Sequence, residues 1–164
     1  MKLIRWTQKA IATVFFLGYL PWMPGTFGSA FVVAVLWYVS FHMHCALTPV
    51  MWWIGGVAVT GFSMIVASRP QEVFHNDDPR QVIIDECAGQ FITFFFLPLT
   101  LNVLVLGFLL FRFFDIVKPY PIYKMEELEG GLGITMDDVV AGVFANISLM
   151  AIVWGYHIVH AALK

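Results

Sequence analysis

Hydrophobic residues fill three long stretches of this chain that hold no charged residue, at positions 10–68, 87–111 and 139–163. About 20 apolar residues are enough for a helix to cross a bilayer. The first stretch is interrupted twice by Pro-containing segments, at 21–25 and 48–49, which are typical helix boundaries. The pattern therefore predicts an all-α, polytopic membrane bundle.

The breaks divide the first stretch into three helical segments. Residues 26–43 and 50–67 are long enough to span the membrane, and a last helix is expected from about 135 to 162. Residues 3–19 carry cations in their first half, which favours a helix lying at the membrane interface.

Pro98 lies in the middle of the second uncharged stretch. Proline disrupts a helix interior, so 97–100 is interpreted as a tight turn between helices over about 80–97 and 99–117. Each would have about 18 residues, roughly 27 Å at 1.5 Å per residue. The alternative is one long helix kinked at Pro98. The hairpin gives about five spanning helices plus the interfacial helix, and it brings Asp85 and Glu86 to the level of Arg112.

Charge is concentrated in two islands, 69–86 and 112–138, which hold all but four of the twenty charged residues. The hairpin puts both islands on one side of the membrane with nearly all Lys and Arg, and the positive-inside rule makes that side the cytoplasm. With 60% hydrophobic residues, 12% charged residues and no basic patch, the chain is expected to form one membrane domain, 1–164, without a nucleic-acid partner.

Adjacent acids at the membrane boundary are the first candidates for chemistry. Asp85 and Glu86 need a compensating cation there, and Mg²⁺ prefers carboxylate oxygens. An ion pair with Arg80 or Arg112 is the alternative. Asp137 and Asp138 are expected at the same depth as Asp85 and Glu86, although capping of the last helix is the simpler interpretation of this pair.

A polar stripe and a helix start are candidates for binding phosphate. Arg112, Asp115 and Lys118 are three residues apart and so share a helix face, although such a stripe also occurs where a helix leaves lipid. The turn at 24–29 opens a helix with exposed amides and hydroxyls, which suit an anion, but it is also ordinary helix punctuation.

Four sequence blocks, in this order, resemble the phosphatidylglycerophosphatase A family: PGTFGS at 24–29; DPR at 78–80 with IDE at 84–86 and GQ at 89–90; FRFFD at 111–115 with KPYP at 118–121; and GGLGI at 130–134 leading to DDVVAG at 137–142. The resemblance implies a bundle with one central helix, a Mg²⁺ cofactor, and hydrolysis of phosphatidylglycerophosphate in a bacterial inner membrane with the site facing the cytoplasm. Cys87 stands where a branched aliphatic residue is expected.

The resemblance gives each candidate an expected role. The expected catalytic residues are Asp85, Glu86, Asp115 and Asp138. The expected metal ligands are Asp78, Asp85, Glu86, Asp115, Asp137 and Asp138. The expected substrate-binding residues are Gly25, Thr26, Ser29, Arg80, Arg112 and Lys118. Neither cysteine is followed by the Arg of a phosphocysteine mechanism and no Asp-x-Asp pair occurs, so we expect attack by a metal-activated water. The alternative function is a small transporter or ion pathway.

Overall fold

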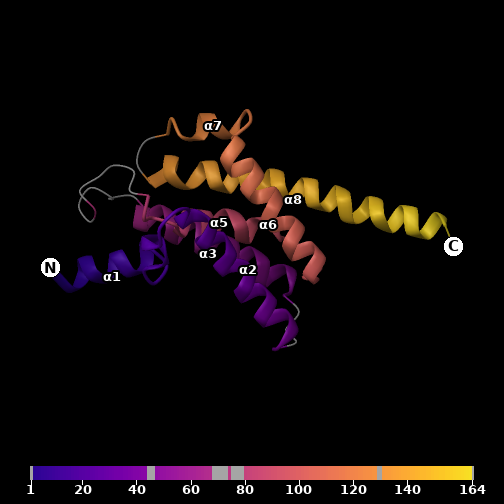
Figure 1. Cartoon of the computed structure of the whole chain (residues 1–164), viewed down its shortest axis with the longest axis horizontal. Helices are drawn as coiled ribbons and strands as arrows, with labels where there is room; N and C mark the ends of the chain where they lie inside the picture. The colour runs from indigo at the N-terminus through magenta and orange to yellow at the C-terminus, as the bar shows by residue number, and fades with distance from the viewer. Residues whose placement is uncertain (1, 44–46, 68–73, 75–79, 129–130, 164) are drawn as a thin grey trace.

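A computed structural model describes residues 2–43, 47–67, 74, 80–128 and 131–163. Within these ranges the regular elements are seven α-helices and one short 3-10 helix, and none is a strand (Figure 1). They are α1 (Lys2–Ala12), η1 (Leu17–Tyr19), α2 (Pro24–Phe41), α3 (Pro49–Ala67), α5 (Ile84–Thr93), α6 (Leu101–Val117), α7 (Ile122–Met125) and α8 (Gly131–Ala162). The predicted all-α class is confirmed.

The short helix α5 is the centre of the bundle. It packs against α2, α3, α6 and α8, and most of its side chains are buried. Ile83, Cys87 and Phe94 form a hydrophobic core with Leu104 of α6 and Leu149 of α8. This arrangement agrees with the central helix that the family resemblance implies.

The chain turns between α5 and α6, as the sequence predicts. Residues 94–100, including Pro98, are not helical, and the Thr100 hydroxyl caps α6 by accepting a hydrogen bond from the Val103 amide at 3.4 Å. Arg112 of α6 returns to the end of α5 that carries Glu86. Pro98 therefore belongs to a helix–helix connection, and the single kinked helix is excluded.

The predicted extent of the first hairpin arm, 80–97, is wrong. Helix α5 has 10 residues, about 15 Å at 1.5 Å per residue, which is half of a roughly 30 Å hydrocarbon core. It can end inside the protein because the Asn146 amide of α8 donates to the carbonyls of Thr93 and Phe95 at 2.9 and 3.0 Å. These hydrogen bonds satisfy carbonyls that a helix C-terminus otherwise leaves without partners.

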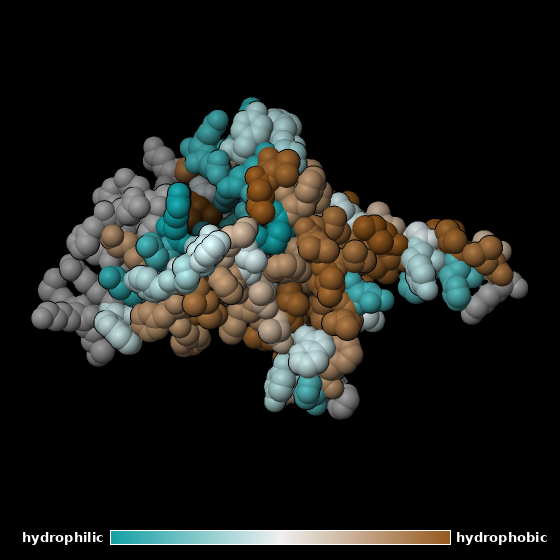
Figure 2. All heavy atoms as spheres, viewed as in Figure 1, coloured by the Kyte–Doolittle hydropathy of each residue, from teal (hydrophilic) through white to brown (hydrophobic). Residues whose placement is uncertain are grey.

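The expected five spanning helices are not confirmed. Three of the described helices are long and apolar enough to cross a membrane: Pro24–Phe41, Pro49–Val66 and Leu132–Ala162. In Figure 2 most hydrophilic residues gather around α7 and the start of α8, whereas hydrophobic residues cover the centre of the molecule.

The predicted N-terminal helix is also shorter than expected. Helix α1 ends at Ala12, because Val14, Phe15 and Phe16 have positive φ angles that a right-handed helix cannot continue through. The amide of Ile83, just before α5, donates to the Ala12 carbonyl at 2.9 Å and ties the end of α1 to the start of the central helix.

Helices α5 and α8 approach closely at two glycines. A Cβ atom on Gly142 would lie 2.3 Å from the Gly89 carbonyl oxygen, and one on Gly89 would lie 2.3 Å from the Asp138 carbonyl oxygen. Small residues allow backbones to approach in this way in membrane proteins, where helices gain little from hydrophobic association. The contact sets the distance between the first turn of α5 and Asp138.

We predict that Gly142→Ala destabilises the protein by about 1–3 kcal/mol, the usual effect of overpacking, because the added methyl meets the backbone of α5. Gly155→Ala on the same helix is the matched control, since no atom lies within 4 Å of its added Cβ. Thermal unfolding of both variants in detergent measures the effect. Equal stability of the two would contradict the close contact.

Candidate active site

A cavity of about 660 Å³ lies where the starts of α2, α5 and α8 meet the C-terminal end of α6. It is lined by Trp22, Met23, Pro24, Gly25, Arg80, Val82, Asp85, Glu86, Arg112, Asp115, Lys118, Glu126, Gly133, Ile134, Asp137 and Asp138. Two uncharged stretches separate these residues in the sequence. The fold therefore brings the two charged islands together at one end of the bundle.

Three carboxylates form a compact cluster in the cavity wall. One oxygen from each of Asp85, Glu86 and Asp138 lies within 4.8 Å of the others. Asp85 and Asp138 are only 6% and 4% exposed. Buried Glu86 Oε2 and Asp138 Oδ1 accept no hydrogen bond from the described residues.

The cluster concentrates negative charge where water is scarce. Asp85 and Glu86 lie outside the three candidate spans. Burial raises the pKa of Asp85 well above its usual value, and the charges of Glu86 and Asp138 raise it further. The pKa of Glu86 is raised by burial and by Asp115, against the opposing effects of its hydrogen bond with Asp85 and of Arg112.

A divalent cation fits this cluster. Three carboxylates, two of them with an unsatisfied buried oxygen, supply the hard ligands that Mg²⁺ takes, and the adjoining cavity leaves room for water and a phosphate oxygen. The cation would also offset the cost of burying three like charges. Asp85, Glu86 and Asp138 are therefore the residues that could hold a metal.

Arg112 and Asp115 form an ion pair at the end of α6. The Arg112 guanidinium donates to Asp115 Oδ2 at 2.5 Å across three residues of helix. Both side chains are mostly buried, and Arg112 Nε has no partner among the described residues. The arginine therefore keeps a donor that its ion pair does not use.

Lys118 binds two carboxylates. It caps α6 in a left-handed conformation with φ of 43°, and its ammonium group donates to Asp137 at 2.7 Å and also to Glu126. Burial alone would lower the pKa of Lys118, but these two hydrogen bonds raise it above its usual value. Asp137 thus has a cation partner, unlike the three clustered acids.

The predicted phosphate-binding turn only partly reaches the cavity. Gly25 lines it, and a Cβ there would lie 2.0 Å from Glu86 Oε1, so glycine is what lets the carboxylate reach α2. Thr26 and Ser29 are not among the lining residues. The Ser29 hydroxyl donates to the Gly25 carbonyl at 3.1 Å, and the buried Thr26 hydroxyl has no partner in the described part of the chain.

Of the other predicted residues, Arg80 lines the cavity, whereas Asp78 lies outside the described residues. Cys87 is not among the lining residues, and its thiol donates to the Gly28 carbonyl at 3.4 Å. Sequence reasoning missed Glu126 as a partner of Lys118, although both belong to the same charged island. It also missed further lining residues: Trp22, Met23, Val82, Gly133 and Ile134.

Comparison with known proteins gives a consistent assignment. The family model described as Phosphatidylglycerophosphatase A matches residues 10–153. A protein named putative phosphatidylinositol-3-phosphatase, from Bacteroides thetaiotaomicron, is 34% identical over 94% of this chain and 98% of its own length. No solved structure matches the chain significantly.

Two similar proteins carry the name of the family. The phosphatidylglycerophosphatase A of Escherichia coli is 30% identical over 82% of this chain and 77% of its own length. The protein of the same name from Haemophilus influenzae is 46% identical over 46% of this chain and 47% of its own length.

We predict that the purified chain binds Mn²⁺, used as a spectroscopic substitute for Mg²⁺, and that Asp138→Asn weakens binding at least by the roughly 10- to 100-fold that loss of an outer-shell partner costs. The free-ion signal in electron paramagnetic resonance measures the affinity. Glu127→Gln, an exposed residue that does not line the cavity, should bind as the parent protein does. Unchanged affinity in Asp138→Asn would remove the cluster as a metal site.

Proposed function

This chain belongs to the phosphatidylglycerophosphatase A family and is a phosphatase, and we propose that it removes the terminal phosphate of phosphatidylglycerophosphate to give phosphatidylglycerol. The observation that carries the proposal is the buried Asp85–Glu86–Asp138 cluster with unsatisfied carboxylate oxygens. It opens on a cavity that also contains Arg112 and Lys118. Acids that could hold a metal and cations that could bind a phosphate thus line the same cavity.

Both cations can contact a phosphoryl group without giving up their ion pairs. Arg112 lines the cavity and spends one of the five N–H donors of its guanidinium on Asp115. Lys118 uses two donors on Asp137 and Glu126, and an ammonium group has three. Together they would neutralise charge that develops on the phosphoryl oxygens in the transition state.

Mg²⁺ bound by Asp85, Glu86 and Asp138 would polarise a phosphoryl oxygen and activate the attacking water. The bond between phosphorus and the glycerol oxygen breaks, a bond from the water oxygen to phosphorus forms, and the products are inorganic phosphate and the lipid alcohol. A covalent phosphocysteine at Cys87 is disfavoured, because its buried thiol is directed at the Gly28 carbonyl. Gly25 supports the site by making room for Glu86.

The arrangement also speaks against a transporter or ion pathway. Such a pathway uses ionisable groups near the middle of the membrane. Helices α2 and α3 contain no charged residue, and in α8 none follows Asp138. The acids gather at one end of the bundle, which supports an enzyme that acts on a headgroup at the membrane boundary.

The same distribution supports a cytoplasmic orientation in the bacterial inner membrane. Arg112 and Lys118 lie at the cavity end of α6, and Arg80 also lines the cavity. Cations collect on the cytoplasmic side of membrane proteins. The headgroup would enter from that side while the acyl chains remain in the bilayer.

An inositol lipid phosphate is the second candidate substrate, because the Bacteroides thetaiotaomicron relative that matches 94% of this chain is named a putative phosphatidylinositol-3-phosphatase. Both lipids are phosphomonoesters of a glycerophospholipid, and the same metal and phosphate contacts would serve either. The two lipids differ in the part of the headgroup that carries this phosphate, and contacts to that part would decide which lipid is hydrolysed. The two substrates are therefore compared directly in the test.

We expect the purified chain in lipid nanodiscs to release phosphate from phosphatidylglycerophosphate when Mg²⁺ is present, and much more slowly from phosphatidylinositol 3-phosphate. Asp85→Asn should lower the rate by about 100-fold or more, since it removes a ligand of the ion that stabilises the transition state. A colorimetric phosphate assay measures both.

Glu127→Gln serves as the control and should keep the parent rate, because this exposed residue does not line the cavity. Faster release from the inositol lipid would reassign the substrate. Full activity in the presence of a chelator would contradict the metal-dependent mechanism.

A further inference from the structure

A second cavity, of about 330 Å³, lies between α2 and α6 and is lined entirely by hydrophobic residues. Helix α2 contributes Ala30, Val33, Ala34 and Trp37, and helix α6 contributes Leu101, Val105 and Phe108. We call it the α2–α6 groove. Trp37, Leu101 and Val105 are well exposed on its edges, so the groove opens to the hydrocarbon that surrounds the bundle.

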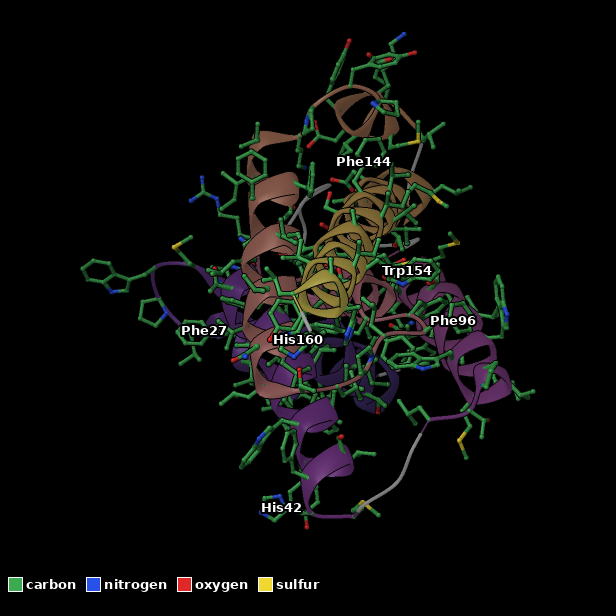
Figure 3. All side chains as sticks on the ribbon, turned by 90° about the vertical axis from the view of Figure 1, so that its right-hand side faces the viewer. Phe27, His42, Phe96, Phe144, Trp154 and His160 are labelled. Atoms are coloured by element: carbon green, nitrogen blue, oxygen red, sulfur yellow. The ribbon has the colours of Figure 1, made fainter. Side chains whose placement is uncertain are left out.

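The groove and the polar cavity are built by the same two helices. Pro24 and Gly25 at the start of α2, and Arg112 and Asp115 near the end of α6, line the polar cavity. The groove continues along the same helix pair, which pack against each other. Figure 3 shows the direction of α2, from Phe27 near its start to His42 beyond its end.

Helix geometry gives the depth of the groove below the polar cavity. Ala30 and Val33 follow Gly25 by five and eight residues, about 8 and 12 Å along the axis at 1.5 Å per residue. Phe108 and Leu101 precede Arg112 by four and eleven residues, about 6 and 16 Å. One leaflet of hydrocarbon is roughly 15 Å deep, half of the 30 Å core. The groove therefore covers about 10 Å along the helices, which is most of the depth of one leaflet.

We propose that the α2–α6 groove binds one acyl chain of the lipid whose terminal phosphate occupies the polar cavity. This inference rests on the proposed function, since it requires a substrate with a phosphate head and a hydrocarbon tail. The two cavities match the two ends of such a lipid. Cations and acids line the cavity for the phosphate, and apolar side chains line the groove for the acyl chain about 6–16 Å deeper.

The groove acts by positioning rather than by hydrophobic attraction. An acyl chain gains little from leaving lipid for an apolar surface, because both are hydrocarbon-like. A chain held along α2 and α6 instead fixes how far the headgroup rises toward Asp85 and Glu86. Small misplacements of a reacting group cost large factors in rate, so occupancy of the groove should appear in catalytic efficiency.

Ala34 offers the direct test, because it is exposed at the groove and a larger side chain would fill the space. We expect Ala34→Phe to lower kcat/KM about fivefold or more for dioleoyl phosphatidylglycerophosphate. Ala34→Phe should hydrolyse the deacylated headgroup, glycerophosphoglycerophosphate, at a rate within about twofold of that of the unsubstituted protein, since this substrate has no acyl chain to place in the groove.

The matched control is Ala58→Phe on α3, an exposed alanine that lines neither cavity, and it should change neither substrate. If Ala34→Phe loses activity equally on both substrates, or loses none on either, the proposal is overturned. If the parent protein hydrolyses no lipid at all, the proposed function fails, and the second measurement then tests the groove on its own.

That measurement is crosslinking of the unmodified chain in nanodiscs. The probe is a phosphonate analogue of phosphatidylglycerophosphate, which is not hydrolysed, with a photoactivatable group in the middle of one acyl chain. We expect peptides of α2 and α6 that line the groove to be labelled, and an excess of the analogue without the photoactivatable group to compete. Labelling that phosphatidylglycerol displaces equally well, or labelling spread evenly over all helices, would identify ordinary surrounding lipid and reject the proposal.

Discussion

The close contact of α5 with α8 is the constraint on which the site depends. Gly89 and Gly142 leave no room for a Cβ atom between the two backbones. Asp85 lies one turn before Gly89, and Asp138 lies one turn before Gly142, so the glycine contact brings both acids toward the same point. Any side chain at these glycines would separate the helices and the carboxylates with them. The geometry of the carboxylate cluster thus depends on backbone packing as well as on the acids.

The six acids that line the cavity differ in the partners that they have. Asp115 is held by Arg112, and Asp137 and Glu126 are held by Lys118. The other three, Asp85, Glu86 and Asp138, each place one oxygen within 4.8 Å of the others. Like charges this close and this buried are unfavourable without a cation. The ion pairs therefore do more than neutralise charge: by occupying three acids, they leave the other three as the group that could hold a metal ion. Sequence alone did not distinguish these two groups.

Much of this arrangement was predictable because its causes are local. Proline disrupts the interior of a helix, and a turn at Pro98 returns Arg112 to the level of Glu86. The length of α5 was not predictable, because the residue that satisfies its last carbonyls is Asn146, about 50 positions later on α8. The pairing of Lys118 with Glu126 is similar, since it depends on a left-handed cap that ends α6 and redirects the chain. Non-local hydrogen bonds have no signature in hydropathy.

The short central helix has a consequence for how a membrane protein can present acids to a headgroup. Helix α5 ends after about 15 Å, so its C-terminus lies inside the bundle and its N-terminus lies at the cavity. A helix N-terminus carries partial positive charge, which favours the carboxylates of Asp85 and Glu86 in the first turn. The start of α2 adds a second N-terminus at Gly25. The start of α8 adds a third. Three helix N-termini and three basic side chains, Arg80, Arg112 and Lys118, therefore surround the acids, and they would favour the binding of a phosphate despite the negative charge.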